Sequence, residues 1–231
     1  LTRLQMTPEQ LARAGQELAR AGDRATPPDV VFYTGCNVPR TPHILLGALE
    51  ILDRLGLDYE VAGGPAFCCG VYQFNGGDAK TSGRQAYGTV DRLAAFGAGR
   101  VLSWCPSCQI QIGDIALEGR AAAGAERPFE LDPFFVFMEG HLDRLSAAFV
   151  RPVRRRIALD ERPAVAGTMR AVKAILSRIE GVELVDLEVP RVGAMAISMP
   201  GTPAFAAAVR EGAFRAAADA GVDSYVTIYH G

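Results

Sequence analysis

Five cysteines of this 231-residue chain have a spacing that suits a shared chemical site. Two of them are adjacent and precede a glycine, in the segment Cys68–Gly70. Neither a disulfide nor core packing explains this pair well. A disulfide between neighbours needs a strained ring, and adjacent side chains on a core strand point to opposite faces. The other three are Cys36 and the two ends of the CxxC turn Cys105–Cys108. Thiols in this pattern are suited to metal ligation or to redox chemistry.

Three interpretations of these thiols are compatible with the residues. Zinc takes four ligands and would leave one thiol over, whereas a thioredoxin-type pair at Cys105 and Cys108 would leave the adjacent pair without a role. An iron–sulfur cluster accounts for more, because several irons need several thiolates that converge from separate loops. Glycines let the backbone approach the sulfides of a cluster, and Gly35 and Gly70 are placed for this. We favour the cluster, with zinc and uncommitted thiols as the alternatives.

The elements around the cysteines follow an alternating pattern of strands and helices. The apolar runs within 29–36, 59–63 and 97–105 predict buried strands. Helices are predicted between them, one starting at Thr41 and one over 81–96. This order indicates a parallel sheet covered by helices. Each cysteine group then falls at or just after the carboxyl end of a strand, where such folds bind ligands.

A second, weaker pattern of the same kind occurs later in the chain. The segments 171–189 and 210–230 echo helix–strand segments of the first half in the same order. In this alignment His230 falls where Cys105 stands. We therefore predict an α/β fold of two pseudo-repeated units, each a small parallel sheet flanked by helices, of which the second lacks cysteines. The predicted division is an N-terminal helical segment 1–28, with Thr7 as its N-cap, a cysteine unit 29–128 and a degenerate repeat 129–231.

Composition and charge exclude several classes of function. The 24 basic and 26 acidic residues nearly balance, which argues against a broad nucleic-acid surface or a polybasic membrane anchor. No run approaches the roughly 20 apolar residues of a transmembrane helix, and the first residues lack the pattern of a signal peptide. We expect a cytoplasmic protein, associated with a membrane only through partners. Because the chain begins at Leu1, we also expect it to be part of a longer polypeptide.

The cysteine pattern resembles the cysteine-rich CCG domain of heterodisulfide reductase and its relatives. These relatives include iron–sulfur subunits of glycolate oxidase, of lactate utilisation complexes and of thiol-linked fumarate reductases. The resemblance covers residues 29–115, and beyond residue 130 it extends only to the family's tandem layout. It implies a noncubane 4Fe-4S cluster that splits a disulfide. The implied cluster ligands, which would also be the catalytic residues, are Cys36, Cys68, Cys69, Cys105 and Cys108.

The resemblance leads to one functional hypothesis and two alternatives. The first is an oxidoreductase: an iron–sulfur redox subunit of a heterodisulfide-reductase-like complex that reduces or oxidises a disulfide or thiol substrate. The second is an electron-relay subunit of a flavin-dependent 2-hydroxy acid or quinone-linked oxidoreductase, without a substrate of its own. The third is a zinc-stabilised interaction module. Expected partners are flavoprotein, ferredoxin-like or quinone-linked subunits. Because the second unit lacks cysteines, a mechanism with two clusters is not expected.

Other residues near the cysteines are weaker candidates for the site. Phe67 and Trp104 directly precede cysteines and could shield a cluster, although core packing predicts the same residues. His43 could donate a proton to a leaving thiolate, or lie on the surface as a helix cap. A loop after the double cysteine supplies further candidates, for the entrance of a substrate pocket or as solvated residues: Tyr72, Gln73 and Asn75.

Overall fold

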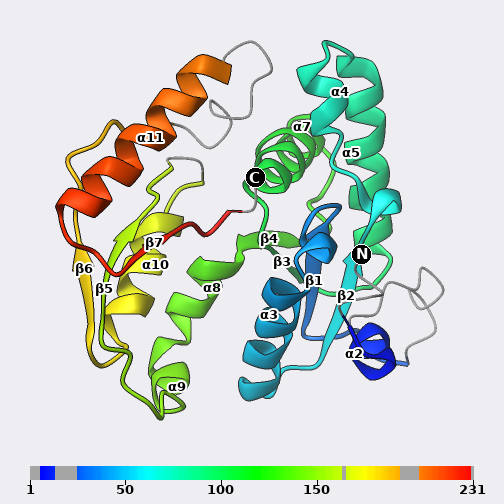
Figure 1. Cartoon of the computed structure of the whole chain (residues 1–231). Coiled ribbons are helices and arrows are strands. Elements are labelled where there is room, and N and C mark those ends of the chain that lie inside the picture. The colour runs from blue at the N-terminus through cyan, green and yellow to red at the C-terminus, as the bar shows by residue number, and fades with distance from the viewer. Residues whose placement is uncertain (1–5, 14–24, 163–164, 193–202, 230–231) are drawn as a thin grey trace. The chain divides into compact units, whose positions relative to one another are not determined.

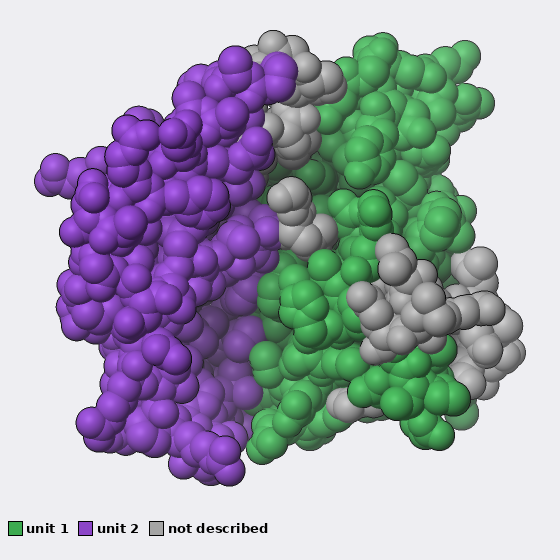
Figure 2. Space-filling view, in the orientation of Figure 1, with its two compact units in different colours: residues 1–134 green, residues 135–231 purple. Residues whose placement is uncertain are grey.

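The computed structural model describes residues 6–13, 25–162, 165–192 and 203–229. The chain divides into two compact units, residues 1–134 and 135–231 (Figure 2). Each unit contains a small parallel sheet flanked by helices (Figure 1), which confirms the predicted α/β fold class. In the part of the chain described, no helix has both the length and the apolar character that a membrane span requires.

The first sheet has the strand order β2-β1-β3-β4, and all neighbouring strands are parallel. Every residue of β1, the predicted apolar run, is buried, as expected for an inner strand of a parallel sheet with helices on its faces. The register of its pairing with β2 shifts between Tyr33 and Gly35, and Cys36 is the first residue after the strand. The strand bounds are Val30–Gly35 for β1, Tyr59–Gly63 for β2, Arg100–Ser103 for β3 and Glu130–Pro133 for β4.

The helices of the first unit connect these strands and cover the sheet. The longest, α5, begins earlier than predicted because Asp78 caps it, accepting a hydrogen bond from the Thr81 backbone amide at 2.9 Å. The helix that starts at Pro106 changes to π-helical geometry over most of its length. The bounds are Val38–Arg40 (η2), Pro42–Arg54 (α3), Pro65–Phe67 (η3), Val71–Asn75 (α4), Ala79–Ala94 (α5), Pro106–Cys108 (α6), Gln109–Leu117 (η4) and Glu118–Ala122 (α7).

The predicted N-terminal helix is observed in its first part as α2, Pro8–Arg13. Thr7 Oγ1 accepts a hydrogen bond from the Gln10 amide at 3.2 Å, and Gln10 Oε1 accepts one from the Thr7 amide at 2.9 Å. This reciprocal pair is a capping box, so the predicted N-cap is confirmed. The remainder of the predicted helix, from residue 14 to residue 24, lies outside the described residues.

The first unit extends to Phe134, beyond the predicted end at residue 128. The reason is β4, which pairs in parallel with β3 and places Leu131 opposite Val101. The segment that forms β4, with the sequence ELDP, lacks the β-branched or aromatic run that indicated the other strands. Its pairing therefore depends on the edge that β3 offers.

The second sheet has the strand order β6-β5-β7 and is also parallel. The first strand in sequence is central and the next two flank it, as in the β2-β1-β3 part of the first sheet. This shared order supports the predicted pseudo-repeat. The bounds are Arg155–Leu159 (β5), Val182–Val185 (β6), Ser224–Val226 (β7), Phe134–Gly140 (α8), Leu142–Ser146 (α9), Thr168–Ser177 (α10) and Pro203–Asp219 (α11).

Candidate metal centre

The five cysteines lie at one edge of the first sheet, after the carboxyl ends of its strands. Cys36 directly follows β1, and Cys68 and Cys69 follow β2 after the short helix η3. Cys105 lies two residues after the end of β3, and Cys108 is at the end of α6. Because β2, β1 and β3 are parallel neighbours, their carboxyl ends bring the three cysteine segments together.

Cys36 is close enough to the other cysteine segments for their charges to interact. Its pKa is raised to about 11, first because the thiol is partly buried and then because of the charges of Cys68, Cys69 and Cys105. This coupling matters because Cys36 is separated in sequence from the other four. The structure therefore places Cys36 within electrostatic reach of the other cysteine segments, and its role as a ligand of the same site stays a prediction.

The thiol of Cys108 hydrogen-bonds with the sulfurs of Cys69 and Cys105. These hydrogen bonds are the largest cause of a lowered pKa at Cys69 and of a pKa of about 7 at Cys105. The pKa of Cys108 is raised, because hydrogen bonds to both neighbours stabilise its neutral form and its side chain is buried. Cys69, Cys105 and Cys108 thus form one hydrogen-bonded group of thiols.

Backbone amides also point at the sulfurs. The Gly70 amide donates to Cys68 Sγ at 3.4 Å, and a hydrogen bond with the Val71 backbone lowers the pKa of Cys69. Hydrogen bonds with the backbone of Ser107 and Cys108 act in the same direction on Cys105. Donors of this kind stabilise thiolates, and in iron–sulfur proteins they help to set the reduction potential.

The two glycines beside the cysteines lie in close contacts, Gly35 against a cysteine sulfur and Gly70 against the backbone of Ser82. Gly35 has a φ of +62°, and a Cβ added to it would lie 2.8 Å from Cys108 Sγ. Gly70 has a φ of +82°, and its added Cβ would lie 2.6 Å from the backbone oxygen of Ser82. A residue with a side chain at either position would be strained in backbone conformation and would also collide with a neighbour. Both sites thus require glycine for reasons of space as well as of φ.

Two residues that support the site were not predicted. The hydroxyl of Tyr33, on β1, donates to the backbone oxygen of Phe67 at 2.6 Å and lies against Cys108. Burial is the largest cause that raises the pKa of Tyr33, and the charges of Cys108 and Cys69 add to it. Thr89, on α5, donates to the backbone oxygen of Cys68 at 2.8 Å. Strand alternation could have placed Tyr33 on the same face as Val31, but its partner lies 34 residues away.

The weaker sequence candidates divide between core and surface. Phe67 is buried in the same apolar cluster as Cys69 and Cys108, while Trp104 is half-buried and stacks on Phe134 with ring centroids 5.6 Å apart. The side chain of His43 is exposed near the start of α3.

The loop candidates after the double cysteine differ in exposure. Tyr72 and Asn75 are exposed, whereas Gln73 is half-buried and its Oε1 is buried without a hydrogen-bond partner among the described atoms. His230 lies outside the described residues.

The spacing of the thiols bears on the choice between one ion and several. Within the described ranges, no three or more His, Cys, Asp and Glu side chains are grouped so that they could hold a metal ion. Five thiols exceed the four ligands that a single zinc ion takes. The amide donors to the sulfurs are of the kind found in iron–sulfur proteins, so the residues present are chemically suited to an iron–sulfur cluster as well as to a metal ion.

The comparison with protein families agrees with the cysteine pattern. Residues 30–113 match the family CCG, described as a cysteine-rich domain, and this range includes all five cysteines. The predicted resemblance to the CCG family is confirmed for this part of the chain. The match supports a metal-binding or iron–sulfur redox role in general. A search of curated proteins finds no match.

Proposed function

We propose that the CCG domain holds an iron–sulfur cluster and that the chain is a redox subunit. The observation that carries the proposal is the convergence of three cysteine segments at the carboxyl ends of β2, β1 and β3. The proposed ligands of a 4Fe-4S cluster, noncubane as in the resembling family, are Cys36, Cys68, Cys69, Cys105 and Cys108.

The five thiols differ in their exposure to solvent. Cys69 and Cys108 are each 2% exposed and pack in the apolar core, where water is excluded. Cys36, Cys68 and Cys105 are only partly buried, so a substrate or a partner protein can approach from their side. When bound, the cluster would supply electron transfer, while the amides of Gly70 and its neighbours stabilise the thiolates.

The proposed reaction is the reduction or oxidation of a disulfide or thiol substrate in a heterodisulfide-reductase-like complex. Cleavage of a disulfide consumes two electrons, and each sulfur leaves as a thiolate that takes up a proton. Because the cluster carries electrons and does not generate them, a donor subunit is required. We propose a flavoprotein, a ferredoxin-like protein or a quinone-linked subunit as that partner, and the cytoplasm as the location.

One feature of the surface favours the relay alternative, in which the chain passes electrons without a substrate of its own. Tyr72 and Phe74 are 62% and 50% exposed on α4, directly after the double cysteine. Exposed aromatic side chains are enriched at protein interfaces. Disulfide turnover by the isolated chain with reduced methyl viologen as donor separates the two: turnover supports the reductase, and its absence in a cluster-loaded protein supports the relay.

The metal content of anaerobically purified protein tests the proposal. We expect iron and acid-labile sulfide in equal amounts and a paramagnetic signal that Cys69→Ala removes. Lys80→Ala is the control, because this side chain is exposed on α5 and its removal leaves all five thiols and their hydrogen bonds in place. Stoichiometric zinc without sulfide would support the interaction module instead, and an unchanged spectrum in Cys69→Ala would remove Cys69 from the ligands.

A further inference from the structure

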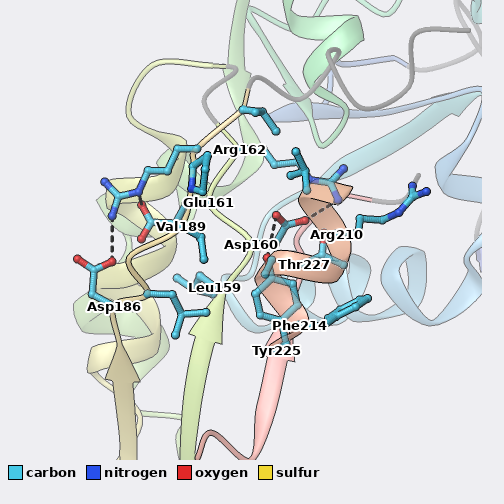
Figure 3. A pocket seen from close by; sticks show the side chains of 16 residues that line it. Leu159, Asp160, Glu161, Arg162, Asp186, Val189, Arg210, Phe214, Tyr225 and Thr227 are labelled. Atoms are coloured by element: carbon cyan, nitrogen blue, oxygen red, sulfur yellow. Dashed lines mark hydrogen bonds and ion pairs between the residues drawn. The ribbon is translucent and has the colours of Figure 1, made fainter. Parts of the chain in front are cut away.

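The unit that has no cysteines contains a cavity at the corresponding edge of its sheet. This cavity, of about 280 Å³, opens at the carboxyl ends of β5, β6 and β7 (Figure 3). This is the edge that carries the cysteines in the first unit, with the same strand order. Since β6 and β7 lie on opposite sides of β5, the chain reverses its direction across the sheet at this point. Open parallel sheets bind ligands at such reversals.

Three consecutive charged residues enter the cavity from the end of β5. The side chains of Asp160, Glu161 and Arg162 are only 13%, 16% and 15% exposed. Asp160 pairs with Arg162 at 2.5 Å and accepts a hydrogen bond from the Tyr225 hydroxyl at 3.2 Å. Charges removed from water destabilise a fold unless they are paired, and they concentrate at functional sites.

The other carboxylates of the cavity are also paired. Glu161 binds Lys173 at 2.6 Å and lies 3.5 Å from Arg191, which in turn binds Asp186 at 2.9 Å. No carboxylate of the described residues that line the cavity is thus left without a cation. A cationic ligand would have to displace one of these internal pairs.

Two arginines of the cavity, in contrast, keep hydrogen-bond donors that no described residue uses. The Nε of Arg162 is buried and has no hydrogen-bond partner among the described atoms. Arg210, on α11, also lines the cavity, and it forms no ion pair with any residue that the structure describes. The unmatched polar groups of the cavity are therefore guanidinium donors, which bind carboxylates and phosphates in a planar, two-pronged geometry.

Apolar side chains also line the cavity. Phe214 is 57% exposed and meets Tyr225 edge to face, with ring centroids 5.5 Å apart (Figure 3). Leu159 and Val209 are further apolar residues of the lining. The volume of about 280 Å³ is close to the lower limit of small-molecule sites, which suits a small ligand. A purely structural role, in which the ion pairs stabilise the loops, would explain Asp160 and Arg162. It would not explain why hydrogen-bond donors without a partner lie beside an exposed aromatic ring in a cavity.

We infer that the second unit binds a small organic carboxylate, with the carboxylate group at Arg162 and Arg210 and the apolar body against Phe214. This site is formed by residues of the second unit only and does not depend on the cluster proposed for the first. Its chemistry selects an anion with an apolar part over a bare phosphate or an organic cation. A failure of the cluster proposal would therefore leave this inference standing, and the reverse also holds.

Titration calorimetry of the full chain tests the inference with benzoate, inorganic phosphate and benzylamine as probes. We expect benzoate to bind, phosphate to bind more weakly and benzylamine not to bind. Arg210→Gln should weaken benzoate binding at least about tenfold, because one charged hydrogen-bonding group is lost. Arg210 is exposed, so this variant is expected to fold as the wild type does, which circular dichroism checks.

Arg215→Gln is the matched control, since Arg215 lies on the same helix, does not line the cavity and pairs with Glu211 at the surface. It should bind benzoate like the wild type. Absence of benzoate binding at tens of millimolar, stronger binding of phosphate or benzylamine, or equal weakening in both variants would each overturn the inference.

Discussion

Replacing Gly35 by alanine disturbs one close contact on which the arrangement of the thiols depends. The added Cβ would lie 2.8 Å from Cys108 Sγ, in a backbone conformation with a φ of +62°. Gly56 provides a matched control, because its φ is +61° and an added Cβ would have nothing within 4 Å. Both alanines would be strained in the left-handed region, but only the one at Gly35 would force a sulfur to move.

The two substitutions differ in their expected effect on stability. A residue with a Cβ in the left-handed region costs about 1–2 kcal/mol, and Gly56→Ala should lower the free energy of unfolding by this amount. Gly35→Ala adds overpacking against Cys108, which is 2% exposed, at a further cost of about 1–3 kcal/mol. The expected total of about 2–5 kcal/mol is a large part of the 5–15 kcal/mol typical of a folded domain.

Urea unfolding of the reduced, cluster-free protein measures this difference, and the iron bound per chain after anaerobic reconstitution measures its effect on the site. We expect Gly56→Ala to retain iron and Gly35→Ala to lose most of it, because Cys108 can no longer keep its position. If both variants lost equal stability and both bound iron fully, the close approach of Gly35 to Cys108 would have no role and the reasoning would be refuted.

Three further predictions concern residues that the structure assigns to specific contacts. Tyr33→Phe removes the hydrogen bond to the buried oxygen of Phe67 and should lower the free energy of urea unfolding by about 1–3 kcal/mol; a change under about 0.5 kcal/mol contradicts this. Thr89→Val leaves the Cys68 oxygen without its donor, and a loss of about 1–2 kcal/mol is expected in the same assay, with an unchanged midpoint as the contrary result. The pKa of Tyr225 is raised to about 12 by burial and by the nearby Asp160 carboxylate, so its phenol favours the folded state below pH 10 and this contribution is lost as pH rises toward 12. The ultraviolet titration difference between wild type and Tyr225→Phe should have its midpoint near 12, and a midpoint near 10 opposes the assignment.

The part of the site that the sequence predicted depends on local patterns. The apolar runs of β1 and β2 and the glycines beside the cysteines are short-range signals. The rule that parallel strands share a carboxyl edge then brings Cys36 near cysteines far away in the chain. The predicted gathering of thiols followed from these patterns without knowledge of any side-chain contact.

The supporting contacts could not be predicted because they join residues that are distant in sequence. Thr89 binds a backbone oxygen 21 residues away, and Tyr225 binds Asp160 across 65 residues. The segment Gln109–Leu117 has buried residues on both sides of Gly113, which weakens any helical periodicity, and its π-helical form depends on packing against other elements. β4 likewise lacks a strand pattern of its own and pairs because β3 has a free edge.

Iron analysis of the Cys36→Ala variant tests the central claim most directly, because Cys36 is the thiol most remote in sequence from the others. We expect the anaerobically purified wild type to contain about four irons per chain with matching sulfide. The variant should lose iron or show a changed paramagnetic spectrum. A variant with the full iron content and the spectrum of the wild type would contradict the claim that all five thiols hold one cluster.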